Sequence, residues 1–303
     1  MTNSSLIRSV YLTSHKGTLF SFGDAKYRLA ACAITAMASF MPASASFAAE
    51  MQWKQTLDIP VGKGMPQGVS ADILGIQIGD SYEVVKSKVE KIIAGQPDGA
   101  KASMQEFFRA FQMQVHGGEF VETKYPSQLQ LKIDGGTTEV DEEIHLHFSA
   151  PSSGAQLYSI ERHIWYNKHE VQPRISDLLA SLTQKYKATP FVYVADGSSV
   201  TRAFVFDDGR ALTPAPNTKT DCTAMGALPD TEDYLRTINY SGNCDIVLSL
   251  QTDYGISNDH AEYIRFDLGD AERAKANAKA DYQYFRDYVS GLASGTAGTG
   301  PKL

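Results

Sequence analysis

The chain has 303 residues, of which 28 are Lys or Arg and 35 are Asp or Glu, and its formal net charge at pH 7 is −7. This acidic balance argues against nucleic acid or an anionic membrane as the partner, because both require clustered Lys and Arg. Loss of the N-terminal segment described next leaves about 255 residues with a formal charge of −10, enough to bury a substantial core as one large domain or two small ones.

Residues 1–48 have the three parts of a secretory signal. Basic residues at 26 and 28 precede an uncharged run of 13 residues at 29–41, and small residues around Ala45 and Ala48 provide cleavage sites. The run is shorter than the roughly 20 residues that span a bilayer, so a stable membrane anchor is the weaker interpretation. Lipidation at Cys32 is also weaker, because the apolar stretch follows that cysteine instead of preceding it. We therefore expect a cleaved signal peptide and a protein of the periplasm or the extracellular space.

Two cysteines, Cys222 and Cys244, remain after the signal. In an exported chain an even pair at this spacing favours a structural disulfide over a metal or redox site, and no C-x-x-C pattern is present. Closing a loop of about 20 residues contributes roughly 3 kcal/mol in the chain-entropy model. We predict a disulfide between Cys222 and Cys244.

Two helices are predicted near the start of the mature chain. Asp80 and Glu83 have the spacing of a capping box, in which the Asp80 side chain accepts a hydrogen bond from the Glu83 amide. The helix that follows carries its apolar residues on one face, at Val85, Val89, Ile92 and Ile93. The spacing of a second apolar stripe predicts another helix over 104–115, with core positions Met104, Phe107, Phe108, Phe111 and Val115.

A change to two-residue alternation then predicts an antiparallel meander with one buried face and one wet face. Its apolar positions are Leu129, Leu131, Ile133, Ile144, Leu146, Phe148, Tyr158, Ile160 and Ile164. Polar residues alternate with them, and turn-forming segments at 134–136 and 151–154 separate the strands.

The second half of the chain follows a similar order. A helix begins near Pro173, and its core positions are Ile175, Leu178, Leu179, Leu182 and Tyr186. Strands are predicted at 191–194, 202–206, 234–240, 245–251 and 261–268. A last helix starts at Asp270, and residues 290–303 form a tail whose Gly, Ser and Thr content predicts disorder.

The order of elements predicts an α+β fold made of tandem helix-plus-antiparallel-meander units with a C-terminal helix. The first unit is expected over 49–170, and the second, with its closing helix, over 171–289. Strands and helices do not alternate as they do in a nucleotide-binding fold. The repetition is one of pattern, since the two halves do not align residue by residue.

Gly79-Asp80-Ser81-Tyr82-Glu83-Val84-Val85 resembles the Gly-x-[Ser/Thr]-x-x-[Glu/Gln]-Val helix entry of small envelope lipoproteins of the outer-membrane assembly type. Val84 stands where that family has Glu or Gln. The tandem layout is similar to β-lactamase-inhibitory-protein-like domains, which implies an interaction module rather than an enzyme. The chain also resembles bacterial envelope proteins with a Lys-Tyr-Gly-x-Pro segment, here Lys185 to Pro190 without the glycine.

The wet face of the first meander holds the sharpest candidate site. His145 and His147 leave the same side of one strand, and a turn formed by residues 152–155 would bring His163 and Glu161 across from them. Two His on one strand with a neighbouring His or Glu could hold Zn²⁺ with an open position for water. The competing interpretation, which we favour, is ordinary cross-strand polar pairing on a solvated face.

No nucleophile elbow, Walker loop, His-Glu-x-x-His or dinucleotide-binding glycine pattern occurs in the sequence. The function that these observations favour is a soluble envelope protein that binds a protein or small ligand through its sheet faces, without a cofactor. A metal-dependent hydrolase using His145, His147, His163 and Glu161 is the alternative. A structural envelope component without a ligand is a third possibility.

Overall fold

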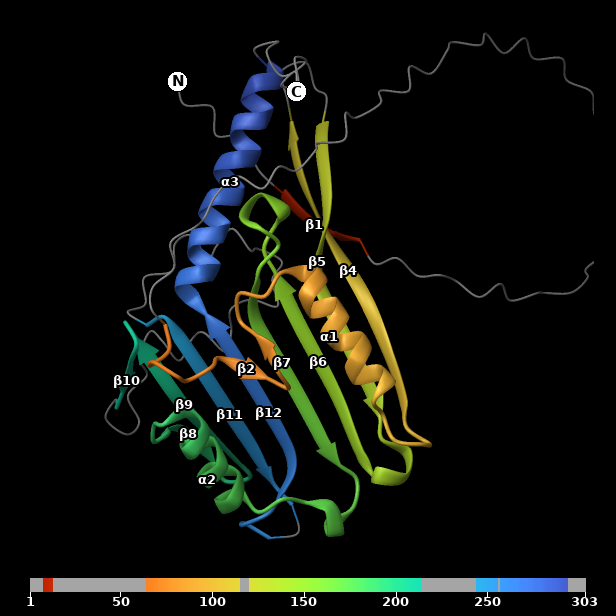
Figure 1. Ribbon diagram of the computed structural model, residues 1–303, viewed down its shortest axis with the longest axis vertical. Coiled ribbons are helices and arrows are strands. Elements are labelled where there is room, and N and C mark those ends of the chain that lie inside the picture. The colour runs from red at the N-terminus through yellow and green to blue at the C-terminus, as the bar shows by residue number, and fades with distance from the viewer. Residues whose placement is uncertain (1–7, 13–63, 115–119, 214–243, 256, 294–303) are drawn as a thin grey trace, which may run out of the picture.

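The computed structural model describes residues 8–12, 64–114, 120–213, 244–255 and 257–293 (Figure 1). Its helices are α1 (Tyr82–Ala94), α2 (Ile175–Tyr186) and α3 (Ala271–Ala293), with 3-10 turns at Gly136–Thr138, Pro151–Ser153 and His169–Val171. The strands are β1 (Arg8–Leu12), β2 (Asp72–Ile73), β3 (Ile76–Gln77), β4 (Lys101–Gln114), β5 (Phe120–Asp134), β6 (Val140–Phe148), β7 (Leu157–Tyr166), β8 (Phe191–Asp196), β9 (Ser199–Asp207), β10 (Arg210–Leu212), β11 (Ile246–Tyr254) and β12 (Ala261–Asp270).

One antiparallel sheet organises this part of the chain. Its strand order is β1-β4-β5-β6-β7-β12-β11-β9-β10, with β8 also paired to β9, while β2 and β3 form a separate two-stranded ribbon. The pairing of β7 with β12 joins strands from the two predicted units into a single sheet. The fold is α+β with a C-terminal helix, as the sequence predicts.

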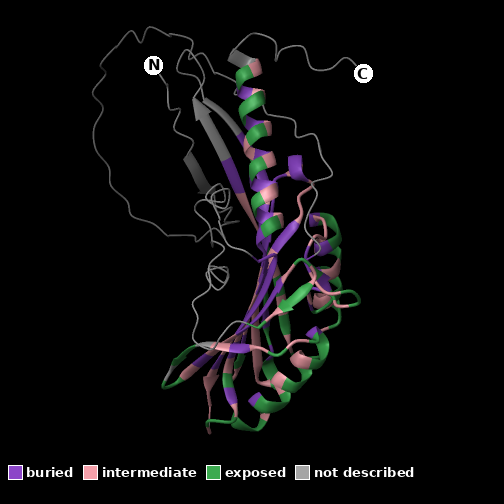
Figure 2. Ribbon diagram, turned by 90° about the vertical axis from the view of Figure 1, so that its left-hand side faces the viewer, coloured by how far each residue is buried: buried purple, intermediate pink, exposed green. Residues whose placement is uncertain are grey.

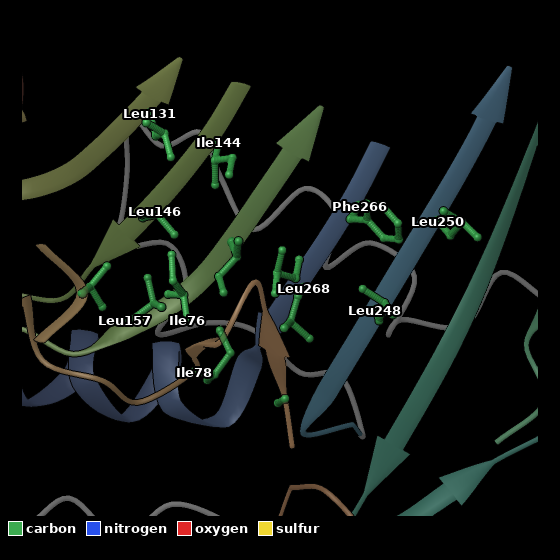
Figure 3. Close-up of a cluster of buried hydrophobic side chains, with 14 of the residues drawn as sticks. Ile76, Ile78, Leu131, Ile144, Leu146, Leu157, Leu248, Leu250, Phe266 and Leu268 are labelled. Atoms are coloured by element: carbon green, nitrogen blue, oxygen red, sulfur yellow. The ribbon is translucent and has the colours of Figure 1, made fainter. Parts of the chain in front are cut away.

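The main hydrophobic core lies between one face of the sheet and the helices α1 and α2. Strand residues with even numbers supply most of it, including Leu146, Leu248 and Leu268, which are at most 1% exposed (Figure 3). Helix α1 adds Val85 and Val89 to the same cluster. The side view shows both short helices on one side of a curved sheet (Figure 2). The opposite face of the sheet is therefore a separate surface.

Helix α3 covers only one end of that opposite face. Its buried stripe, which includes Ala274, Ala278 and Phe285, packs in a second cluster with Ala203 and Val247 of the sheet. The Asp281 carboxylate is completely buried and accepts hydrogen bonds from the Ala150 amide at 3.0 Å and the Ser153 hydroxyl at 2.9 Å, and also from the Ser152 hydroxyl. These contacts fix α3 against the turn that connects β6 to β7.

The predicted helix over 104–115 is wrong, because residues 101–114 form strand β4. Phe107 and Phe108 pair with Gln128 and Pro126 of β5, across a register shift. A strand with apolar residues on both faces produces the same spacing as an amphipathic helix, and aromatic residues pack well on a pleated surface. Pairing with β5, which residue spacing alone does not reveal, favours the strand.

The predicted capping box also differs from the structure. Helix α1 has Ser81 at its N-cap position, without a side-chain cap hydrogen bond. The Asp80 carboxylate instead accepts a hydrogen bond from the Gln77 amide at 2.9 Å and pairs with Lys88 at 2.6 Å. Asp80 therefore fixes the approach to the helix from outside the first turn.

Several predictions fall wholly or partly outside the described residues. The segment predicted as a signal is described only at 8–12, which form β1 beside β4. The strand predicted at 234–240 lies outside the described ranges, and so does Cys222, so the disulfide stays a prediction. Helix α3 runs through Ala293, four residues into the tail expected from 290 onward. Among the described residues, no helix has the length and apolar character needed to cross a membrane.

Candidate functional site

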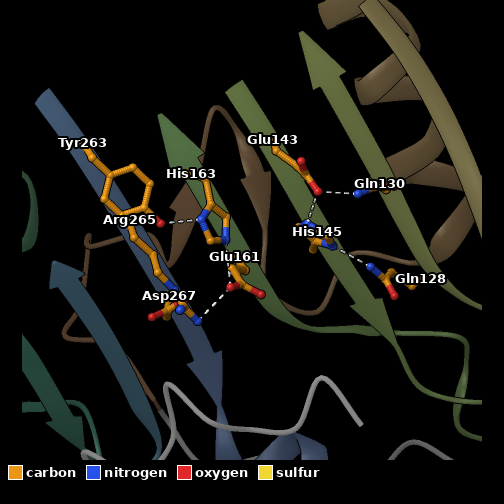
Figure 4. Close-up of polar contacts among 9 residues, drawn as sticks. All are labelled: Gln128, Gln130, Glu143, His145, Glu161, His163, Tyr263, Arg265 and Asp267. Atoms are coloured by element: carbon orange, nitrogen blue, oxygen red, sulfur yellow. Dashed lines mark hydrogen bonds and ion pairs between the residues drawn. The ribbon is translucent and has the colours of Figure 1, made fainter. Parts of the chain in front are cut away.

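The sheet face that α1 and α2 do not cover carries a band of polar and aromatic side chains. We call this band the polar face. It consists of Gln128, Gln130, Lys132, Glu143, His145, Glu161, His163, Trp165, Tyr263, Arg265 and Asp267, most of which are drawn in Figure 4. These residues alternate along β5, β6, β7 and β12 with core residues of the helix-covered side. Local alternation and strand pairing thus place them together.

His145 lies between β5 and a neighbouring carboxylate. The Gln128 amide donates to its Nδ1 at 2.7 Å, and its Nε2 donates to Glu143 Oε1 at 2.8 Å. Glu143 also accepts a hydrogen bond from Gln130 and lies 3.4 Å from the Lys132 ammonium. Burial raises the pKa of Glu143, but the neighbouring His145 and these hydrogen bonds outweigh it, so the net shift is downward. Both ring nitrogens of His145 are engaged.

His163 is held in the same way from the other side. The Tyr263 hydroxyl donates to Nδ1 at 2.5 Å, and Nε2 donates to Glu161 Oε1 at 2.8 Å. Arg265 contacts the same Glu161 oxygen at 2.7 Å and donates to Asp267 at 2.9 Å. A continuous chain of contacts therefore runs from Tyr263 on β12 to His163 and Glu161 on β7, and then back to Arg265 and Asp267 on β12.

Strand pairing joins the two histidine clusters. His145 lies opposite Glu161 in the register of β6 and β7, and Glu143 lies opposite His163. The His145 and His163 rings are 6.0 Å apart in an edge-on arrangement. The expectation that a turn at 152–155 brings His163 and Glu161 across from the other histidines is confirmed for His145, whereas His147 lies opposite Ser159.

His147 occupies a different environment from the other two histidines. It is 5% exposed, with its ring 6.4 Å from that of Tyr158, a member of the cluster under α3. Burial lowers the pKa of His147 to about 4, so its imidazole is neutral at pH 7. Its ring stacks 6.5 Å from that of His145, but it belongs to the packed end of the face.

An aromatic group forms the exposed part of the polar face. The Trp165 ring stacks on His163 at 5.6 Å and lies 5.5 Å from the ring of Tyr263. Trp165 is 37% exposed, so part of its indole ring is open to solvent. Flat aromatic surface beside fixed charges is typical of binding sites, since it offers contact area at small entropic cost.

Two carboxylates of the polar face have pKa values that are shifted in opposite directions, downward for Glu161 and upward for Asp267. Burial opposes the charge on Glu161, but the hydrogen bond from His163 and the charge of Arg265 lower its pKa to about 2. Asp267 is more strongly desolvated, and burial raises its pKa to about 6 in spite of Arg265. The hydroxyl of Tyr263 has a pKa raised by burial to about 12, so it acts as a neutral donor rather than as a nucleophile at pH 7.

The predicted metal-site residues therefore come together only in part. His145, His163 and Glu161 adjoin one another, whereas His147 is buried beside Tyr158. Within the described ranges no group of three or more His, Cys, Asp or Glu side chains has an arrangement that could hold a metal ion. Zinc at His145 or His163 would also have to displace a hydrogen bond that each ring nitrogen already makes.

The sequence identified only His145, His163 and Glu161 of the polar face, and three of the residues it missed, Tyr263, Arg265 and Asp267, come from the distant strand β12. They alternate along a predicted strand, so their common face could be inferred. Their position beside β7 could not, because Tyr263 and His163 are 100 residues apart in sequence. Only the pairing of β7 with β12 brings the two sets together.

No protein family, curated protein or solved structure matches the chain.

Proposed function

We propose that this is an exported, soluble protein of the bacterial envelope that binds a partner, either a protein or a small ligand, through the polar face. The signal-like segment at residues 1–48 supports export, and export in turn favours the predicted disulfide. The resemblance of residues 79–85 to envelope lipoproteins, and of the layout to inhibitory-protein-like interaction modules, points in the same direction.

The observation that carries the proposal is the exposed aromatic group beside the hydrogen-bonded polar network. Trp165 is 37% exposed, while its neighbours His163 and Glu161 are 17% and 21% exposed and fixed by short hydrogen bonds and an ion pair. A partner meets side chains that are already ordered, so little further conformational entropy is lost on binding. Arg265 and Tyr263 add the residue types that dominate binding energy in interfaces.

Photocrosslinking in the producing cell tests the proposal. A photoreactive amino acid is placed at position 165 in one variant and at position 84 in another. Val84 is the matched control, because it is 45% exposed and lies on α1, which packs on the other side of the sheet. A discrete adduct from position 165 and none from position 84 is the expected result. No adduct from 165, or the same adducts from both positions, would contradict it.

Co-purification of the partner with variants of the polar face provides a second readout. The double substitution Trp165→Ala and Arg265→Ala removes the aromatic surface and the guanidinium, and it is expected to abolish co-purification of the crosslinked partner. Lys101→Ala, at an exposed position of β4, is the control and should retain the partner. Retention of the partner by the double variant would show that the contact lies elsewhere.

The metal-dependent hydrolase is the second candidate, favoured by the adjoining rings of His145 and His163 with Glu161. Elemental analysis of purified protein distinguishes it, together with assays on generic ester, phosphate and peptide substrates. Stoichiometric zinc with hydrolysis that is lost in His163→Ala would establish the hydrolase and refute the binding module. Substoichiometric zinc and no hydrolysis above background would exclude it.

The third candidate, a structural envelope component without a ligand, differs in what it contacts. It predicts stable association with membrane fractions and no adduct confined to position 165. Fractionation of the same crosslinked cells separates the two proposals, because a binding module enters the soluble fraction with its partner attached.

A further inference from the structure

A second candidate site lies on the other side of the sheet, beside α2. An open groove of about 560 Å³ is lined by Leu179, Ala180, Thr183, Gln184, Thr189, Pro190 and Arg202. Four of these residues come from the C-terminal part of α2, two from the segment that follows it, and one from β9. The volume falls within the roughly 300–1,000 Å³ typical of small-molecule sites.

Arg202 is the one charged side chain in this lining. It projects from the helix-covered face of β9, since its register partner on β11 is the fully buried Leu250. The next residues on the same face, Phe204 and Phe206, belong to the main core. A guanidinium therefore occupies a position that the strand pattern would assign to an apolar residue.

The charge of Arg202 has no acidic partner among the residues that the structure describes. Its single polar contact there is a hydrogen bond from Nη1 to Thr252 Oγ1 at 3.3 Å. Burial lowers the pKa of Arg202, as expected for a cation removed from water without a counter-charge. Guanidinium has five N–H donors in a planar fork, so most of its donor capacity is directed at no described carboxylate.

We propose that this groove binds a small carboxylate that carries an apolar tail. The Arg202 fork matches the two oxygens of a carboxylate, and the surrounding Leu179, Ala180 and Pro190 provide the surface that an alkyl or aryl tail requires. A single cation in an apolar lining suits a monovalent headgroup better than a phosphate, which usually gathers several basic groups or backbone amides. The ligand neutralises the charge of the half-buried Arg202 side chain and covers the groove.

This site is independent of the polar face. Arg202 and α2 lie on the helix-covered side of the sheet, whereas Trp165 and His163 lie on the opposite side. The proposal for the groove can therefore be refuted without affecting the proposal for the polar face, and the reverse also holds.

Titration of the full chain with octanoate, followed by calorimetry and by amide chemical shifts, tests the proposal. Saturable binding is expected, with shifts concentrated at Ala180, Thr183 and Gln184. Octan-1-ol, which has the same tail and a neutral headgroup, should bind roughly tenfold to a hundredfold more weakly, the range expected for loss of a charge-assisted contact. Octyltrimethylammonium should not bind measurably.

Two variants and one control complete the experiment. Arg202→Gln removes the cation, and Ala180→Asp places a carboxylate at the groove from an exposed helix position, where folding is not at risk. Both should lose octanoate binding by about tenfold or more, whereas Arg210→Gln, at an exposed position of β10 outside the groove, should retain it. Absence of saturable binding, equal binding of the cationic probe, or unchanged affinity in Ala180→Asp would overturn the proposal.

Discussion

Removal of the Asp281 carboxylate should destabilise the protein more than any change on the exposed surface of α3. The side chain is 0% exposed and accepts from the Ala150 amide at 3.0 Å, the Ser153 hydroxyl at 2.9 Å, and the Ser152 hydroxyl. Each hydrogen bond to a charged acceptor is worth about 1.5–3 kcal/mol. Asp281→Ala leaves these buried donors without their acceptor, at about 1–3 kcal/mol for each donor that stays unpaired, so we expect a total loss of about 3–5 kcal/mol.

Urea denaturation followed by circular dichroism measures this free energy of unfolding. Ser153→Ala, which removes one donor, should cost about 1–2 kcal/mol. Asp287→Ala is the matched control on the same helix, because Asp287 is exposed and contacts Gln283 at 2.7 Å, and its loss should change stability by no more than about 0.5 kcal/mol. If Asp281→Ala costs no more than the control, the anchoring role assigned to this carboxylate is wrong.

Three further predictions concern pH, a turn and the cysteines. Burial raises the pKa of Asp267 from 3.8 to about 6. Between these two pH values the folded state binds more protons than the unfolded state. Lowering the pH from 7 to 5 should therefore stabilise the native protein relative to Asp267→Asn, and parallel pH profiles in urea titrations would refute this. A Cβ at Gly135 would lie 2.0 Å from the backbone oxygen of Val140, so Gly135→Ala should cost about 1–3 kcal/mol, and an unchanged temperature of thermal melting would contradict this. Peptide mapping without reductant should recover Cys222 linked to Cys244, and free thiols at both positions would contradict the disulfide.

Local patterns predicted much of the fold. Strict alternation around Leu131, Leu146 and Ile160 identified β5, β6 and β7, since only a half-buried strand has that period. The apolar residues from Ile175 to Tyr186 identified helix α2, because their spacing fits the helical repeat of 3.6 residues and does not fit the two-residue repeat of a strand. Where a segment was apolar on both faces, as in β4, the two periods could not be distinguished, and the choice depended on pairing with a distant strand.

The candidate site was predictable to the extent that it is local. His145, Glu161 and His163 share a face because of alternation and a short turn, and the sequence contains both signals. The contacts of Tyr263 and Arg265 required knowledge that β12 lies beside β7. The buried state of His147 depends on Tyr158 and the cluster beneath α3, which is tertiary packing that a strand pattern does not contain.

The central claim is that the uncovered face of the sheet, rather than its helix-covered side, binds the partner. The chain has two tryptophans, so Trp53→Phe makes Trp165 the sole indole reporter at the centre of the proposed contact. Titration of this variant with the partner captured at position 165 should give a saturable blue shift of its emission, because the exposed indole becomes desolvated. Unchanged Trp165 emission at partner concentrations where the complex is formed would contradict the account.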